Sequence, residues 1–232
     1  MNALAHTPTG SSMIRRLVFK DWYFMRWAIA SYLALGGVAL FLVSNGGEGS
    51  FYAGCILLFT VLISLGIHLA MLTVVEERTQ QTLPFVMSLP ISARDYTMAK
   101  VLANLLIFLV PWATMLIGAL GVIAGRAAIE DGLIPYTVII LTWILVGYIL
   151  ILAVALVSES QVWAIAAMVV SNLAFQAVLY GVSHVPSIAA TMKGDVAVWS
   201  PAAVGLLLAE LAAVALLLGL TFFLQSRKTD FI

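Results

Sequence analysis

Six long apolar stretches, separated by short polar segments, dominate the hydrophobic pattern of the chain. Each stretch is close to or above the roughly 20 apolar residues that a helix needs to cross the hydrocarbon core of a bilayer. None alternates with a period of two residues, as the strands of a membrane barrel do. The pattern therefore predicts an all-α integral membrane protein with six transmembrane helices. We expect them at 27–44, 51–75, 101–124, 136–157, 162–183 and 200–224.

The basic residues of the polar segments predict the orientation of these helices. Nine of the eleven lysines and arginines lie before the first stretch, between the second and third, or after the last. Only Arg126 and Lys193 lie in the other loops. Because lysine and arginine are enriched on the cytoplasmic side of a membrane, we expect both termini to be cytoplasmic. The expected location is a plasma membrane, with the chain as a multi-pass protein.

The segments outside the six-span domain (27–224) are short. Residues 1–12 are small and polar, and we expect them to form a flexible cytoplasmic tail without a cleavable signal peptide. Residues 13–26 place apolar, basic and aromatic side chains at helical spacing, which predicts an amphipathic helix on the inner membrane surface. The alternative is a simple cytoplasmic extension of the first span. Residues 225–232 form a second predicted cytoplasmic tail.

Composition excludes several classes of protein. Hydrophobic residues make up 63% of the chain and charged residues only 9%, whereas soluble domains carry about 25% charged residues. An ordinary soluble enzyme and a disordered protein are therefore excluded. A net charge of zero without a basic cluster argues against nucleic acid as a partner. With one cysteine, and with three histidines at different predicted depths, we expect no disulfide and no metal site.

The loop at 76–99 is the richest polar segment. Glu76 begins a charged run where the second span leaves the membrane, and a short apolar stretch follows. Pro90 ends that stretch, and Ser92 offers an N-cap to the helix that becomes the third span. The loop is therefore predicted to be an ordered helix–turn–helix elbow. Its mixture of apolar and charged side chains suits docking to another protein.

At this loop the sequence resembles the permeases of ATP-binding-cassette (ABC) transporters of the second export type, which have six spans and cytoplasmic termini. The family's loop runs from an acidic and basic step through a Thr-Leu step and a Leu-Pro-x-Ser turn to a lysine. Gln81 and Pro84 depart from the pattern, where the family often has Gly and Glu. The matching residues are Glu76, Glu77, Arg78, Thr82, Leu83, the Ser-Leu-Pro-Ile-Ser segment 88–92, Arg94 and Lys100.

The resemblance implies that the loop is a coupling helix seated in a separate ATPase subunit. The chain has no phosphate-binding G-x-x-x-x-G-K-[ST] motif, so it would not be catalytic itself, and the partner ATPase would bind ATP and Mg²⁺. A second copy of the chain, or a related permease, would complete a bacterial inner-membrane exporter. Its cargo would be hydrophobic or amphipathic: a peptide, a lipid or a drug-like compound. The expected coupling residues are Glu76, Glu77, Arg78, Thr82, Leu83, Phe85 and Arg94.

Polar side chains inside the spans are the candidates for a translocation path. Glu210 is the only charged residue within any predicted span, and a charge at the membrane centre is costly. Hydrogen bonding between helices is the alternative role for all of these side chains. The candidates are Ser64, His68, Asn104, Asn172, Gln176 and Glu210.

Two other functions remain open at this point. In a proton-coupled secondary transporter or channel, Glu210 and His68 would relay protons, although one intramembrane acid is few for that role. An intramembrane enzyme would need a nucleophile, and no G-x-S-x-G motif is found in the chain. Dependence on a separate ATPase distinguishes the exporter from both alternatives.

Overall fold

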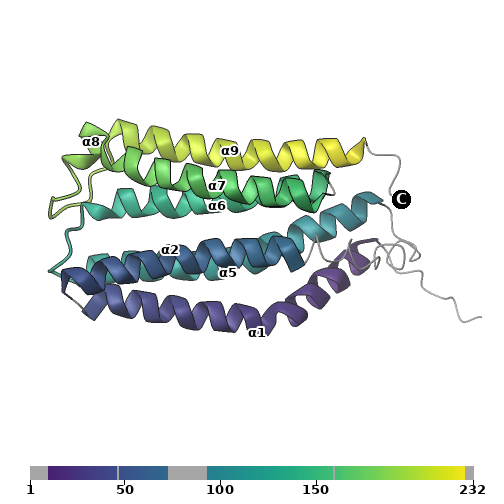
Figure 1. Cartoon of the computed structure of the whole chain (residues 1–232), viewed down its shortest axis with the longest axis horizontal. Coiled ribbons are helices and arrows are strands. Elements are labelled where there is room, and N and C mark those ends of the chain that lie inside the picture. The colour runs from purple at the N-terminus through teal and green to yellow at the C-terminus, as the bar shows by residue number, and fades with distance from the viewer. Residues whose placement is uncertain (1–9, 46, 73–92, 159, 228–232) are drawn as a thin grey trace, which may run out of the picture.

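The computed structural model describes residues 10–45, 47–72, 93–158 and 160–227, and this part of the chain is helical (Figure 1). Six of its helices are long and apolar enough to cross a membrane, which confirms the predicted number of spans and fits a transmembrane protein. The short helix α8 (Pro186–Ala189) precedes the last span. The long helices are α1 (Gly10–Asn45), α2 (Glu48–Ala70), α5 (Ala93–Gly125), α6 (Leu133–Ser158), α7 (Gln161–Ser183) and α9 (Pro201–Ser226).

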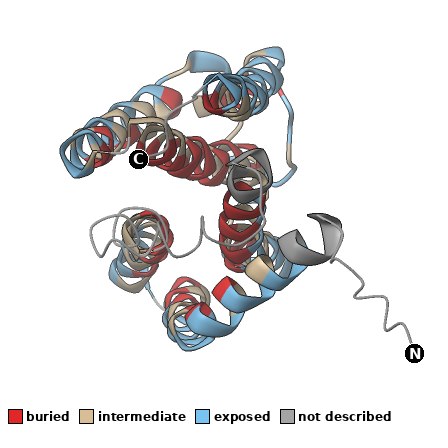
Figure 2. Cartoon of the chain, turned by 90° about the vertical axis from the view of Figure 1, so that its right-hand side faces the viewer, coloured by how far each residue is buried: buried red, intermediate tan, exposed pale blue. Residues whose placement is uncertain are grey.

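The long helices form two groups of three. Helices α1, α2 and α5 pack on one another, and α7 and α9 both pack on α6 (Figures 1 and 2). Helix α6 also contacts α2 and α5, so it joins the two groups. It carries no charged residue and is apolar on all sides, as expected of a helix that is surrounded by other helices. In its most apolar window 72% of the residues are buried, against 11% for α9.

Both ends of the described chain lie at one end of the bundle. Helix α1 begins there, α2 ends there, α5 begins there and α9 ends there (Figure 1). Most residues of the predicted tails and of the predicted loop lie outside the described residues, and their arrangement stays a prediction. The assignment of this end of the bundle to the cytoplasm still rests on the distribution of basic residues, and it stays a prediction.

Helices α1 and α5 are longer than a membrane requires. They contain 36 and 33 residues, which corresponds to about 50 Å each at 1.5 Å per residue, against about 30 Å for the hydrocarbon core. The predicted surface helix at 13–26 is therefore continuous with the first span, and α1 bends along its course (Figure 1). Helix α5 begins at Ala93, directly after the predicted cap, and includes the last residues of the predicted loop.

Helices α1 and α2 approach closely at Gly54. A Cβ atom at this position would lie 2.7 Å from the backbone nitrogen of Val43 and 2.8 Å from the carbonyl oxygen of Ala39. Because backbone atoms of a packed helix cannot move aside singly, we expect Gly54→Ala to lower the free energy of unfolding by about 1–3 kcal/mol. Thermal unfolding of the purified chain in detergent measures this loss.

Gly37 on α1 provides the matched control. A Cβ atom there would meet nothing within 4 Å. Gly37→Ala should therefore leave the stability unchanged or raise it by up to about 1 kcal/mol through helix propensity. Equal melting temperatures for the two variants would contradict the close approach of α1 and α2.

Candidate functional site

Most of the predicted coupling residues lie outside the described residues, and the structure describes only the helices on either side of them. Helix α2 and the two residues after it lead into the loop, and α5 leads out of it. Arg94 lies in the first turn of α5. The predicted coupling residues that fall outside the described ranges are Glu76, Glu77, Arg78, Thr82, Leu83 and Phe85.

A buried ion pair connects α1 to α5 near the end of this loop. The Nζ atom of Lys100 donates to Oδ2 of Asp21 over 3.0 Å. Asp21 is 6% exposed and Lys100 is 4% exposed. Lys20 lies 3.7 Å from the other carboxylate oxygen of Asp21, but its side chain is 57% exposed. Two opposite charges are thus withdrawn from solvent at the place where α5 enters the bundle.

Asp21 is not among the residues predicted above, although the sequence contains a signal for it. Asp21 is the only acidic residue in the segment 13–26, which also contains four basic residues. It also shares one helical face with Met25 and Ile29, which are both buried. An acid on the apolar face of an amphipathic helix needs a partner, because an unpaired buried charge is costly. Lys100 supplies that partner from a position 79 residues away.

Hydrogen bonds continue from Lys100 to α6. The side-chain amide of Asn104 donates to the carbonyl oxygen of Lys100 over 2.9 Å. The Tyr148 hydroxyl, on α6, donates to the carbonyl oxygen of Asn104 over 3.0 Å. The Tyr148 ring stacks on Phe108 with a centroid separation of 4.0 Å. Asn104, a candidate for the translocation path, therefore lies fully buried in the contact between α5 and α6.

The other path candidates are spread over both groups of helices. His68 Nδ1 lies 3.1 Å from the Tyr32 hydroxyl, which connects α2 to α1. Ser64, one turn earlier on α2, is half-buried, and Gln176 on α7 is exposed. Glu210 on α9 is 5% exposed, and its Oε2 atom has no hydrogen-bond partner among the described residues. His68 and Glu210 thus belong to different three-helix groups.

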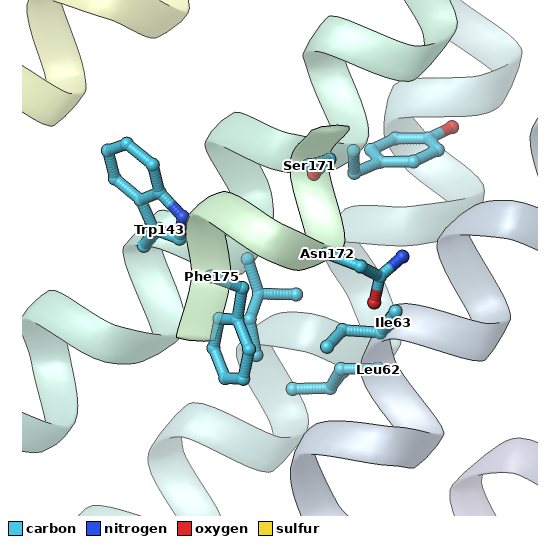
Figure 3. Close-up of a pocket in the computed structure, with 8 residues that line it drawn as sticks. Leu62, Ile63, Trp143, Ser171, Asn172 and Phe175 are labelled. Atoms are coloured by element: carbon cyan, nitrogen blue, oxygen red, sulfur yellow. The ribbon is translucent and has the colours of Figure 1, made fainter. Parts of the chain in front are cut away.

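A small pocket lies between α2, α6 and α7 (Figure 3). Its volume of about 20 Å³ is enough for one or two water molecules and too small for a cargo molecule. Asn172 is the path candidate that lines it, and its amide nitrogen donates to the carbonyl oxygen of Met168. The lining residues are Leu62, Ile63, Trp143, Ile144, Tyr148, Ser171, Asn172 and Phe175.

Two further hydrogen bonds attach neighbouring helices to α6. Trp112 Nε1 on α5 donates to the carbonyl oxygen of Leu141 over 2.8 Å. The Gln225 amide on α9 donates to the carbonyl oxygen of Leu156. Together with Tyr148, these contacts make α6 the element on which movements of α5 and α9 would converge.

Comparison with protein-family models, with curated proteins and with solved structures gave no match for this chain.

Proposed function

We propose that the chain is the membrane-spanning permease subunit of an ATP-driven exporter of the ABC class. The observation that supports this proposal best is the continuity of α5 (Ala93–Gly125) from the end of the predicted coupling loop into the bundle. A partner that moved the loop would act on one continuous helix of 33 residues. Pro111, the proline inside α5, lies beyond Lys100 and Asn104, so no proline separates the start of α5 from the contacts of these two residues.

The positions of the helices on either side of the loop support the same function. Helix α2 ends and α5 begins at the same end of the bundle as both ends of the described chain (Figure 1). The charged residues at 76–78 are well suited to fix the register of a docked partner, because charge pairs across an interface set orientation. In this proposal that end faces the cytoplasm of a bacterial cell, where the partner ATPase binds ATP and Mg²⁺.

The cargo path would form between two permease subunits, either two copies of this chain or this chain and a related permease. The pocket between α2, α6 and α7 is too small to hold a cargo within one subunit. The outer surfaces of the helices are apolar, as Ile56 on α2 and Leu173 on α7 illustrate by their 66% and 68% exposure. A path with such walls suits a hydrophobic or amphipathic cargo.

Co-purification with an ATPase tests the proposal. The tagged chain is extracted in mild detergent from its native host, and the bound proteins are identified by mass spectrometry and assayed for Mg²⁺-dependent ATP hydrolysis. We expect an ATPase of roughly 25–35 kDa, the size of one or two small domains. Glu76→Lys/Glu77→Lys should abolish its association, because the reversed charges repel the partner's docking surface.

The matched control is Glu48→Lys/Glu130→Lys. It makes the same change of charge on two exposed side chains in the outer loop region, at the opposite end of the bundle. We expect this variant to retain the ATPase. A well-folded wild-type oligomer without any associated ATPase would refute the exporter function.

Glu210 favours a second candidate function, proton-coupled transport. A buried carboxyl group with an unpartnered oxygen, as found among the described residues, is typical of a proton-carrying side chain in a membrane. If the chain works this way, purified protein in liposomes should move protons without any ATPase, and Glu210→Gln should stop that flux. A proton flux that Glu210→Gln leaves unchanged would exclude this candidate.

A further inference from the structure

The structure assigns Asp21 and Lys100 to a positioning pair that holds the N-terminal part of α1 against the first turns of α5. This pair is the first step of a polar connection that runs from α1 through α5 to α6. Its positioning role stands on the geometry alone. Its consequence for transport, which is to pass movement of the loop into the bundle, rests on the proposed function.

Because it is buried, the Asp21–Lys100 pair can hold α1 in one position on α5. Lys100 lies two turns into α5, and its Nζ atom reaches Asp21 over 3.0 Å in a place where both side chains are less than a tenth exposed. A solvated ion pair tolerates many geometries, whereas a buried pair must keep its partners together because neither charge is hydrated. The contact therefore fixes where the N-terminal part of α1 lies on α5.

The same region of α5 is also held to α6. Asn104 is one turn beyond Lys100, and it connects the Lys100 carbonyl oxygen to the Tyr148 hydroxyl through bonds of 2.9 and 3.0 Å. The Phe108–Tyr148 stack reinforces this contact one turn later. A displacement of the first turns of α5 would thus act on α1 and α6 together.

Packing of α6 would extend a displacement of α5 to the second group of helices. Helix α6 packs against α7 and α9 as well as against α2 and α5. In the proposed exporter, the ATPase moves the loop that ends where α5 begins. The pair would make α1 follow that movement, and the Asn104–Tyr148 contact would make α6 follow it.

Distances between spin labels in the full-length chain test the positioning role. In a Cys55→Ser background, Phe19→Cys and Leu102→Cys carry one label on α1 and one on α5. The side chains of Phe19 and Leu102 are 65% and 40% exposed. We expect a single narrow distance distribution in the parent protein and its loss in Asp21→Asn. The charge-reversed pair Asp21→Lys/Lys100→Asp should restore it.

Lys20→Gln is the control for a general effect of charge, because Lys20 also neighbours Asp21 but has an exposed side chain. It should keep the narrow distribution. An unchanged distribution in Asp21→Asn, or equal broadening in Lys20→Gln, would overturn the positioning role. This experiment needs no ATPase, so it decides the role of the pair even if the proposed function fails.

The neutral pair Asp21→Asn/Lys100→Gln tests the transmission of movement in the complex with the ATPase. With a fluorescent amphipathic dye as the probe cargo, it should keep ATPase binding and ATP hydrolysis but reduce dye export per ATP by about ten-fold, within the range expected for residues that couple two sites. A purely structural pair would change the amount of folded complex and leave export per ATP unaltered. That unaltered ratio would overturn the transmission role.

Discussion

Lys100→Met should lower the free energy of unfolding of the purified chain by about 3–5 kcal/mol, because the buried carboxylate of Asp21 loses its buried counter-charge and keeps only the exposed Lys20 nearby. Methionine keeps most of the volume of the lysine side chain, so the loss reflects the missing charge rather than a cavity. Unfolding in mixed detergent micelles, followed by helical circular dichroism, measures the change.

Two further variants distinguish the contribution of the buried pair to stability from that of the exposed Lys20 near it. Lys20→Gln should cost less than about 1 kcal/mol, because exposed ion pairs contribute little. Asp21→Leu/Lys100→Met should recover most of the stability, since replacing both members of a buried pair by apolar residues is often neutral. If Lys100→Met were no more harmful than Lys20→Gln, the burial of the pair would be refuted.

The spans could be predicted from the sequence because the bilayer imposes a length on each apolar stretch. That constraint acts along the chain and needs no knowledge of which helices are neighbours. It also explains why α6 could be recognised as a span but not as the central helix. Its lack of any polar face was visible in the sequence, while its contacts with α2, α5, α7 and α9 depend on packing.

Pairings between distant helices were the part that the sequence could not predict. Lys100 was noted for its place in the loop motif, yet nothing in its neighbourhood indicates a partner 79 residues earlier in α1. His68 likewise was predicted as a candidate for the translocation path, and the partner that the structure gives it, Tyr32, lies on α1. Such contacts follow from the rotation of each helix about its axis, which periodicity defines only approximately.

The sequence also could not show that α1 is one continuous helix. An amphipathic segment and an apolar span have the same helical period, so the boundary between residues 26 and 27 marks a change of surroundings rather than a break in the helix. The bend in Figure 1 allows one helix to serve both segments. Asp21 lies in the first of them, where a buried acid indicates packing against another helix.

Glu210→Leu should raise the free energy of unfolding by about 1–3 kcal/mol, the cost of burying a polar group without a hydrogen bond. Glu210 is 5% exposed, and its Oε2 atom has no partner within the described residues. Leucine has a similar size and suits the apolar surroundings of α9. The melting temperature of the purified chain in detergent measures the gain.

Gln225 on the same helix supplies a control for which the opposite change in stability is expected. Its amide donates to the carbonyl oxygen of Leu156 on α6, so Gln225→Leu removes a bond that exists and should lower the stability by about 0.5–1.5 kcal/mol. A loss of stability in both variants would show that the Glu210 carboxyl is satisfied by a group outside the described residues. A gain of stability in Glu210→Leu combined with a loss of transport would show that the buried carboxyl serves function. Functional sites commonly lower the stability of a protein in this way.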